Sequence, residues 1–116
     1  MSKFEITKLK DGEYHFHLRA DNGHILLTSQ RYKELSSAKD GIASVKKNAA
    51  NDKRYQRKEA HNGEPMFNLK AGNHQVIGTS QMYSSVESRE EGIEAIKRDA
   101  PEASVEVVTE AAVHTH

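Results

Sequence analysis

The block Thr28-Ser29-Gln30-Arg31-Tyr32 returns 51 positions later as Thr79-Ser80-Gln81-Met82-Tyr83, with one change. Around it, residues 16–49 can be laid on residues 67–100 without a gap, and 13 of the 34 positions are identical. So dense an ungapped match is typical of an internal duplication. The sequence therefore predicts two copies of one structural unit in a row.

Each copy is expected to contain three strands followed by a helix. In the first copy a strand begins at Phe4 and turns at Asp11-Gly12, and apolar and polar residues then alternate from Tyr14 to Ala20. This period of two indicates a strand with one buried face.

The next turn is marked by Asn22-Gly23, a pair that favours a type I′ hairpin turn. A two-residue loop at this point would set Ala20 opposite Ile25, with both side chains on the buried side. The third strand is predicted over residues 24–29.

The corresponding turn of the second copy has two candidate loops, Gly72-Asn73 and Asn73-His74. The two pairings differ by two residues, so either choice leaves the same residues facing the core. Val76 and Gly78 are therefore expected on the buried side.

A helix is expected after each set of strands, with Ser37 and Ser88 as the N-cap residues. Each serine stands three residues before an acidic residue, Asp40 or Glu91, which is the spacing of a capping box. Apolar residues follow at helical spacing and form one stripe along each helix.

Gly41 and Gly92 occupy corresponding positions beside this apolar stripe. Glycine is a poor helix former, so its presence there calls for a reason. We expect both glycines to permit a close approach of the helix backbone to the sheet.

Pro101 ends the second helix, and Val105–Val108 reads as one further strand, which gives the pattern βββα-βββα-β. We expect a single domain over residues 1–110, divided into repeats at about 1–53 and 54–110. Residues 111–116 are expected to form a flexible tail.

Composition excludes several classes of function. The chain has 116 residues and no cysteine, so it has no disulfide, thiolate nucleophile or cysteine-built metal site. No apolar run is long enough to span a membrane, and the first residues lack the apolar core of a secretory signal. We therefore expect a soluble cytoplasmic protein without a membrane partner.

The charges balance overall but not along the chain. With 17 basic and 17 acidic residues, bulk electrostatics argue against a dedicated nucleic-acid or membrane binder. Residues 1–58 hold 13 Lys/Arg and 7 Asp/Glu, a net charge of +6, and residues 59–116 hold 4 and 10, a net charge of −6. These halves could attract each other or a neighbouring molecule. We favour two solvated faces of opposite sign, because exposed ion pairs contribute little each.

The repeated block is the first candidate for a functional surface. A serine nucleophile needs an activating base and an oxyanion hole, and neither block supplies a paired His or Lys. We expect instead that the Ser side chains satisfy backbone groups at the end of the third strand, and that the Tyr rings pack where strand passes into helix. The candidate surface consists of Thr28, Ser29, Gln30, Tyr32, Thr79, Ser80, Gln81 and Tyr83.

His15 and His17 lie at i and i+2 on the outward face of the second strand, a spacing that can hold a metal ion. No third ligand is near in the sequence, and the second copy has Met66 and Asn68 at the corresponding positions. We therefore expect solvated histidines, with no metal and no cofactor.

The most basic segment spans the end of the first helix and the start of the second copy. Basic side chains with Tyr55 among them could contact a nucleic-acid backbone and stack on a base. The second copy has no equivalent segment. This alternative function, weak nucleic-acid binding, rests on Lys46, Lys47, Lys53, Arg54, Arg57 and Lys58.

Three stretches of the first copy resemble a known family. They are Gly-Glu-Tyr-His-Phe-His-Leu-Arg-Ala at residues 12–20, Asn-Gly-His-Ile-Leu-Leu-Thr-Ser-Gln-Arg-Tyr at residues 22–32 and Gly-Ile-Ala-Ser-Val-Lys-Lys-Asn-Ala at residues 41–49. The chain resembles the YegP-like small bacterial proteins of unknown function over nearly its whole length and in both copies. One departure is Gln30 and Gln81, where the family usually has Glu.

The resemblance implies an α+β fold. Two tandem β(3)-α-β units would share one largely antiparallel sheet, exchange their C-terminal strands about a pseudo-twofold axis and pack two helices on the sheet. Residues 55–58 would close one unit and residues 105–108 the other, each in its neighbour's part of the sheet. The family has no established biochemical role, so the resemblance implies no activity.

Three hypotheses about function follow. The leading one is a non-enzymatic binding or interaction module with its partner at the sheet surface or in a groove on the pseudo-twofold axis, because the repeated residues form no catalytic set. Weak nucleic-acid binding is the second. A small enzyme is the third, and it would require a deep polar pocket that gathers Ser29, Ser80 and a histidine. We expect a monomer, because the duplication already supplies the symmetry partner.

Overall fold

The computed structural model describes residues 2–108 of the 116, and the tail expected at residues 111–116 lies outside them. The described chain forms one seven-stranded sheet and two long helices, with a short 3-10 helix after each. In chain order the elements are β1 (Lys3–Lys8), β2 (Tyr14–Arg19), β3 (Ile25–Thr28), α1 (Leu35–Asn48), η1 (Asp52–Arg54), β4 (Tyr55–Glu59), β5 (Pro65–Lys70), β6 (Val76–Thr79), α2 (Val86–Asp99), η2 (Ala100–Glu102) and β7 (Ser104–Val108).

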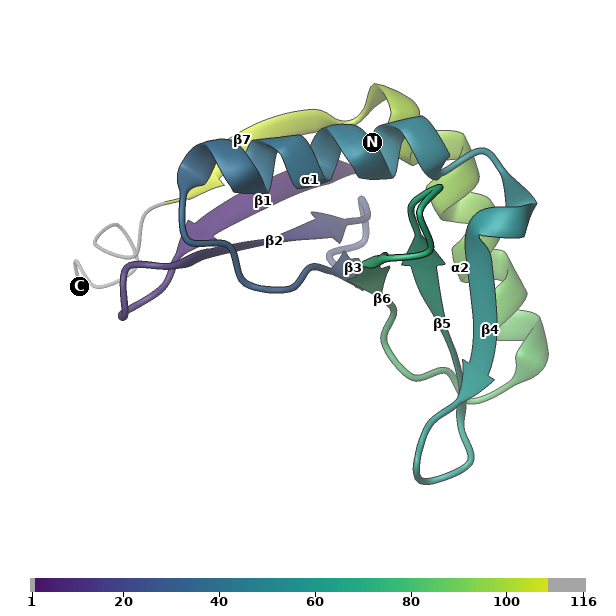
Figure 1. Ribbon diagram of the computed structural model, residues 1–116. Helices are drawn as coiled ribbons and strands as arrows, with labels where there is room; N and C mark the ends of the chain where they lie inside the picture. Colours follow the sequence, from purple (N-terminus) through teal and green to yellow (C-terminus); the bar gives the residue numbers. More distant parts are fainter. Residues whose placement is uncertain (1, 109–116) are drawn as a thin grey trace.

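The two copies form the two halves of this sheet (Figure 1). The strand order is β4-β5-β6-β3-β2-β1-β7, so β3 and β6 meet at the centre, and only the β1–β7 pair is parallel. The strand that follows each helix lies in the other copy's half, with β4 beside β5 and β7 beside β1. The α+β fold with exchanged strands, which the resemblance implied, is therefore confirmed.

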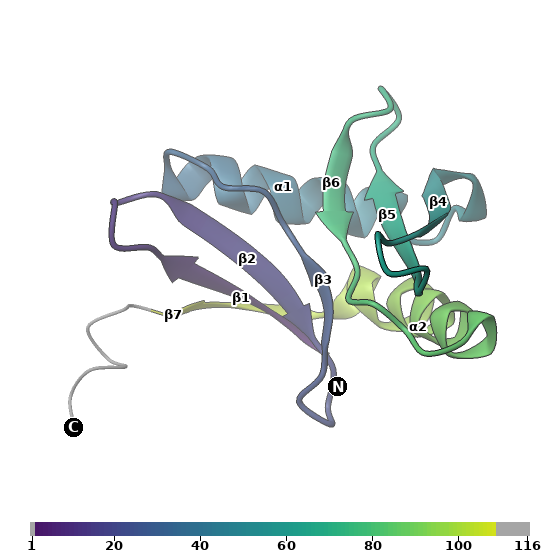
Figure 2. The ribbon, with the colours of Figure 1, turned by 90° about the horizontal axis from the view of Figure 1, so that it is seen from below.

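The buried face of the sheet carries the core, and α1 lies behind the strands in Figure 2. In β2, Phe16 and Leu18 are fully buried, whereas His15 and His17 between and beside them are not. The second copy buries the corresponding Phe67 and Leu69. The period of two predicted for these strands is therefore confirmed.

The sheet departs from twofold symmetry at its edges. β7 covers the outer edge of β1, whereas in the described part of the chain no strand covers β4. Ile6 of β1 is replaced in β4 by Arg57, which pairs with buried Phe67 and so lies on the same face. A charged residue at an inward position discourages pairing with a further strand. Arg57 thus places a charge where a further strand would have to pair.

All four hairpins use a three-residue loop, so the predicted type I′ turn is wrong. Ala20 N, for example, donates to His24 O at 2.8 Å across such a loop. In each loop an Asp or Asn side chain accepts a hydrogen bond from the N–H two residues later, and the residue between them has a positive φ. A type I turn followed by one left-handed residue is a common hairpin connection. The four pairs are Asp11-Gly12, Asn22-Gly23, Asn62-Gly63 and Asn73-His74.

The longer loop shifts the strand register and adds a bulge in each copy. Ile25 pairs with Arg19, and Val76 pairs with Lys70. Arg19 and Lys70 alternate with buried neighbours and so lie on the outward face of their strands. The prediction that Ile25 and Val76 face the core is therefore wrong, whereas Gly78 does lie on the buried side.

Both helices begin earlier than the capping pattern predicted. The N-cap of α2 is Ser85, whose hydroxyl accepts a hydrogen bond from the Ser88 N–H at 3.0 Å. The N-cap of α1 is Glu34, which makes no side-chain cap bond. Ser37 and Ser88 therefore lie inside the first turn and are not caps. In each copy the predicted cap lies three residues beyond the observed one, so the spacing of serine and acidic residue does not mark the helix start.

Gly41 and Gly92 make room for tyrosine rings rather than for the sheet backbone. A Cβ atom on Gly41 would collide with the Tyr32 hydroxyl, and one on Gly92 would collide with the Tyr83 hydroxyl. The Tyr32 ring also stacks on Phe16 with its centroid 6.1 Å away, and the second copy repeats this stack at 6.3 Å. The predicted close approach is present, but its partner is a side chain from the loop before the helix.

The two halves meet at the axis through one residue pair, Thr28 and Thr79. Beside it, Leu27 and Gly78 occupy equivalent positions of the two copies and share one space. A Cβ atom on Gly78 would lie 2.5 Å from Leu27 Cγ, so no side chain fits there while the leucine is in place. The halves close around a single leucine at a position where exact symmetry would require two.

We expect Gly78→Ala to lower the free energy of unfolding by about 1–3 kcal/mol, because the added methyl group overpacks the space that Leu27 fills. The same change made in a Leu27→Ala background should cost less, because the colliding side chain is gone. Chemical denaturation of the four proteins measures this coupling. Gly72→Ala is the control, since its Cβ atom would meet only Arg54 at an ordinary 3.6 Å. Equal costs in the two backgrounds would contradict the shared space.

We propose that the domain expected over residues 1–110, of which the structure describes residues 2–108, folds as one cooperative unit, so that division of the chain at Asn51 should leave two fragments that do not fold alone. Separation would take β1 away from β7, and β5 and β6 away from α1. Amide proton spectra of fragments 1–51 and 52–116 should show narrow dispersion, and an equimolar mixture should recover native dispersion. Two fragments that each give a dispersed spectrum would contradict the proposal.

Candidate functional site

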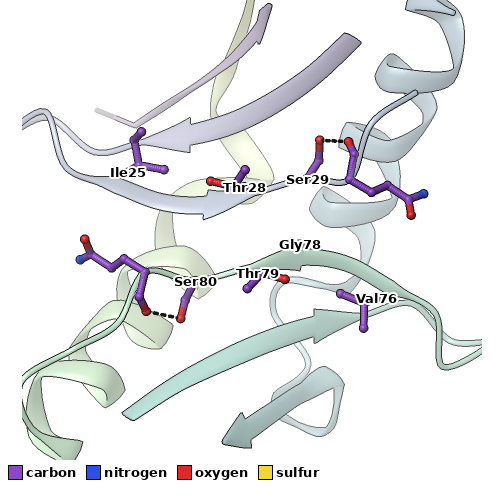
Figure 3. Close-up of a pocket in the computed structure, with 9 residues that line it drawn as sticks. Ile25, Thr28, Ser29, Val76, Gly78, Thr79 and Ser80 are labelled. Atoms are coloured by element: carbon purple, nitrogen blue, oxygen red, sulfur yellow. Dashed lines mark hydrogen bonds between the residues drawn. The ribbon is translucent and has the colours of Figure 1, made fainter. Parts of the chain in front are cut away.

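Six of the eight residues of the predicted surface line one groove on the outer face of the sheet, where β3 and β6 meet (Figure 3). In this view Ile25 and Ser80 mark one end of the groove, and Ser29 and Val76 mark the other. Its volume is about 610 Å³. We call it the axis groove, and its lining residues are Ile25, Thr28, Ser29, Gln30, Val76, Gly78, Thr79, Ser80 and Gln81.

Both serines of the groove are engaged by the backbone. Ser29 Oγ accepts a hydrogen bond from the Phe16 N–H at 2.9 Å and donates one to the Gln30 carbonyl at 2.6 Å. Ser80 makes the same two bonds in the second copy, at the same distances. The expectation that these serines satisfy backbone groups where the strand ends is confirmed. A serine whose proton is held by a carbonyl oxygen, with no base beside it, is not an activated nucleophile.

The lining of the axis groove is neutral. Within the described residues it contains hydroxyls, amides and aliphatic side chains, and no ionisable group. Thr79 Oγ1 donates to Asn68 Oδ1 at 2.9 Å, whereas the Thr28 hydroxyl has no hydrogen-bond partner in the described part of the chain. Ile25 and Val76 supply apolar surface, and Val76 is 39% exposed. The groove can therefore hold hydrogen-bonding groups and apolar surface, but it offers no general acid or base.

Tyr32 and Tyr83 do not line the groove. Their rings turn to the opposite side and pack between the sheet and the helix, as expected for the junction of strand and helix. Burial raises the pKa of both phenols. The Tyr83 hydroxyl is fully buried and has no hydrogen-bond partner within the described residues. These two members of the predicted surface are therefore parts of the core.

A row of polar side chains crosses the outer face of all seven strands and passes through the axis groove. Neighbouring members are paired residues of adjacent strands, and Asn68 Nδ2 donates to Gln56 Oε1 at 3.1 Å. The groove is thus the centre of a continuous polar strip. From one edge to the other, the row consists of Glu106, Glu5, His17, Thr28, Thr79, Asn68 and Gln56.

His17 belongs to this row, and the ring of His15 on the same strand lies with its centroid 5.1 Å from that of His17. Burial lowers the pKa of both imidazoles, and nearby positive charge lowers them further. In the part of the chain that the structure describes, no group of three or more His, Cys, Asp or Glu is placed to hold a metal ion. Neither histidine lines the groove, so Ser29 and Ser80 are not joined by the histidine that the enzyme hypothesis required.

The predicted basic segment is partly neutralised by an ion-pair cluster. The Arg57 guanidinium lies 3.0 Å from Asp52 and 2.9 Å from Glu90, and Lys97 Nζ lies 2.7 Å from Asp52. Hydrogen bonds from Arg57 and Lys97 lower the pKa of Asp52 to about 2. Arg57 is also the main cause of the lowered pKa of Glu90. Its charge therefore holds β4 to α2 and is not free for a nucleic acid.

Two further members of that segment are also engaged within the fold. Lys46 Nζ lies 5.9 Å from the centroid of the Phe4 ring. Tyr55 is buried, and its hydroxyl donates to the Ala49 carbonyl at 2.6 Å, so the prediction that it could stack on a base is wrong. The remaining basic residues of the segment are Lys47, Lys53, Arg54 and Lys58.

Sequence reasoning missed three residues of the groove, namely Ile25, Val76 and Gly78. A signal for the first two was present, because they correspond at the offset of 51 and stand just before the repeated block. The assumed two-residue loop assigned them to the wrong face. The glycine carried no such signal, since it replaces a leucine of the first copy.

The length and polarity of the two long helices were compared with those of a membrane-spanning helix. Neither α1 nor α2, at 14 residues each, has the length and apolar character needed to cross one.

Comparison with known proteins gives one family. The model of a domain of unknown function (DUF1508) matches residues 10–56 and again residues 60–106, which confirms the duplication. The chain is 55% identical to the UPF0339 protein ACIAD0721 of Acinetobacter baylyi, over 91% of this chain and 96% of that one. A solution structure of yegP from E. coli, a protein of unknown function, has a TM-score of 0.87 and 45% identity and covers 94% of each chain. A solution structure of the UPF0339 protein SO3888 from Shewanella oneidensis has a TM-score of 0.89 and 40% identity, and the match covers 99% of this chain and 98% of that one. The resemblance drawn from the motifs is confirmed.

We expect the Arg57 cluster to stabilise the fold less as the pH falls. The pKa of Asp52 in the folded protein, about 2, lies below its ordinary value of 3.8, so its contribution is present above the ordinary value and is lost as the pH falls towards 2. Asp52→Asn should therefore lower the free energy of unfolding at neutral pH. The difference from the unchanged protein should shrink as the pH is lowered from about 4 to about 2. Urea denaturation across this range measures it, and a difference that stays constant would contradict the assignment.

Proposed function

We propose a function from the geometry, because this chain belongs to the DUF1508 family and the description of that family assigns no activity. The chain is a non-enzymatic binding module that holds its ligand in the axis groove. One observation carries the proposal. The Thr, Ser and Gln side chains of both copies, 51 residues apart in the sequence, line a single groove. The duplication thus builds one shared site from two weak half-sites.

The lining supports binding rather than catalysis. The names of the relatives carry no enzyme activity. Proton transfer needs a titratable group within hydrogen-bond reach of the substrate, and the described lining has none. The serines donate to backbone carbonyls, which leaves them without the activation that covalent catalysis needs.

The chemistry of the lining also selects the ligand class. Thr28 and the amides of Gln30 and Gln81 can donate and accept hydrogen bonds, and Ile25 and Val76 can cover an apolar face. A charged ligand would lose its hydration without gaining a counter-charge. The groove therefore suits an uncharged ligand that combines hydrogen-bonding groups with apolar surface, with a size within the usual range of small-molecule sites.

We further propose that the chain acts as a monomer in the cytoplasm. The duplication supplies both halves of the groove within one chain, so a second copy is not needed to complete it. Arg57 discourages pairing at the β4 edge, which works against head-to-tail assembly. Light scattering on the purified protein should return the mass of one chain.

A pair of exposed apolar residues allows a matched test of the groove. Val76, 39% exposed, lines it, whereas Met82, 56% exposed, lies outside it. The probes are nucleosides, monosaccharides and blocked dipeptides, each beside its charged form, in a thermal-shift screen. We expect uncharged probes to raise the melting temperature, Val76→Arg to abolish that rise and Met82→Arg to preserve it, because a ligand stabilises only the state that binds it.

Two outcomes would refute the proposal. One is stabilisation by charged probes alone, since the neutral lining would then not be the site. The other is an equal loss of ligand stabilisation in the two arginine variants, which would place the binding elsewhere. Each variant is first compared with the parent by its melting temperature without ligand, so that a folding defect is not mistaken for lost binding.

A further inference from the structure

A second cavity lies away from the axis groove, between the C-terminal end of α1 and the β5–β6 hairpin of the other copy. Its volume is about 400 Å³. We call it the hairpin pocket. Its lining residues are Ser44, Lys47, Asn48, Arg54, Ala71, Gly72 and Asn73.

Two cationic side chains, those of Lys47 and Arg54, line the hairpin pocket, and no carboxylate does. Lys47 has no ion-pair partner in the part of the chain that the structure describes. Arg54 uses only its Nε atom, which donates to Asn48 Oδ1 at 3.2 Å. One terminal nitrogen of the guanidinium lies 3.6 Å from where a Cβ atom on Gly72 would be, so the positive charge lies against the hairpin backbone. Two cationic side chains that line one pocket without a counter-charge are an arrangement typical of an anion site.

The end of α1 would by itself disfavour an anion, because the last carbonyls of a helix carry partial negative charge. Here four carbonyls at this end of the helix are already engaged. The Ser44 carbonyl accepts from Asn48 Nδ2 at 2.8 Å, and the Ala49 carbonyl accepts from the Tyr55 hydroxyl at 2.6 Å. The Val45 and Asn48 carbonyls accept backbone N–H groups at 2.8 and 3.1 Å. The oxygens of these four carbonyls therefore accept hydrogen bonds from within the fold.

The hairpin adds donors of its own. Its turn is closed by the His74 N–H, which donates to the Ala71 carbonyl at 2.9 Å. The N–H groups of Gly72 and Asn73 between them have no acceptor within the described residues. Both residues line the pocket.

The pseudo-twofold symmetry supplies an internal comparison. Six of the seven lining residues, all except Arg54, have equivalents that line one cavity around α2 and the β2–β3 hairpin, and two of these equivalents are acidic. Asp99 replaces Asn48 and pairs with Arg98 at 3.0 Å. Asp21 replaces Gly72. The two cavities share a backbone plan, and only the hairpin pocket has lost both carboxylates.

We propose that the hairpin pocket binds a phosphate group. A phosphate carries close to two negative charges at neutral pH and three acceptor oxygens, which match the free terminal nitrogens of Arg54, the Lys47 ammonium and the hairpin N–H groups. The group could belong to a small metabolite or to a nucleic-acid backbone. The pocket does not share a residue with the axis groove. The phosphate site therefore does not depend on the binding module proposed above, and each proposal can fail without the other.

Gly72→Asp is the decisive variant, because it restores the carboxylate of the first copy and leaves both cations in place. Gly72→Ala is its matched control, since a Cβ atom there makes only an ordinary contact with Arg54. Arg54→Gln and Lys53→Gln form a second pair, in which the same charge is lost inside and outside the pocket. Melting temperatures of all four establish that they are folded.

The probe is inorganic phosphate, titrated at constant ionic strength against sodium chloride while amide chemical shifts are recorded. We expect saturable shifts at Asn48, Gly72 and Asn73 in the parent, the Ala variant and Lys53→Gln. Binding should weaken by about tenfold or more in Gly72→Asp and in Arg54→Gln, the loss expected for one charge-assisted contact. Shifts that do not saturate, or that are as strong in Gly72→Asp as in Gly72→Ala, would overturn the proposal.

A second titration with a short single-stranded oligonucleotide separates the two sources of phosphate. Binding that is tighter than that of inorganic phosphate, steeply salt-dependent and lost in Gly72→Asp would support the site and assign it to a nucleic-acid backbone. Binding no tighter than that of inorganic phosphate and lost in the same variant would support the site and assign it to a small phosphorylated molecule. Tight oligonucleotide binding that is retained in Gly72→Asp, together with no response to phosphate, would show that the nucleic-acid contact lies outside the pocket and would overturn the proposal.

Discussion

The two copies can join only because one side chain, not two, fills the space at the pseudo-twofold axis. Leu27 occupies that space, and the equivalent residue of the second copy is Gly78. A perfectly repeated sequence would place two leucines there and force β3 and β6 apart. Thr28–Thr79 is the one pair of strand-paired residues between β3 and β6 in the described part of the chain, and it can form only because this space holds one leucine. Interiors are packed too densely to absorb an extra leucine without displacement of the backbone.

The same seam explains why the repeated block has two roles. Within five residues, the Ser side chain replaces a strand hydrogen bond, the Tyr side chain turns inward against a helix glycine, and the Thr and Gln side chains remain on the outer face. Preservation of the block between the copies is thus largely a requirement of the fold. What makes the block relevant to function is its position on the axis, where two structural copies become two walls of one groove.

The copies agree at the groove and differ at the hairpins, and these two patterns suit different chemistry. Equivalent neutral residues face each other across the axis and can meet a ligand from both sides. At the helix ends, in contrast, one cavity contains Asp21 and Asp99 while the other has Gly72 and Asn48 at the equivalent positions, so only the second cavity retains unbalanced positive charge. The split of +6 and −6 between the two halves of the chain does not predict this difference. Folding mixes the halves, as where Arg57 meets Glu90 and Lys3 meets Glu106.

The sequence by itself determined the duplication, the order of strands and helices, the buried alternation of Phe16 and Leu18 and the structural use of Ser29, because each follows from local spacing. The error over the face of Ile25 came from the hairpin loop. Asn22-Gly23 fits both a two-residue and a three-residue loop, and the choice moves Ile25 from one face to the other. Only the tertiary structure decided which residues from the two copies meet. That Thr28 lies against Thr79, that Tyr55 is buried and that Arg54 faces Gly72 are consequences of packing between segments far apart in the chain, on which local periodicity carries no information.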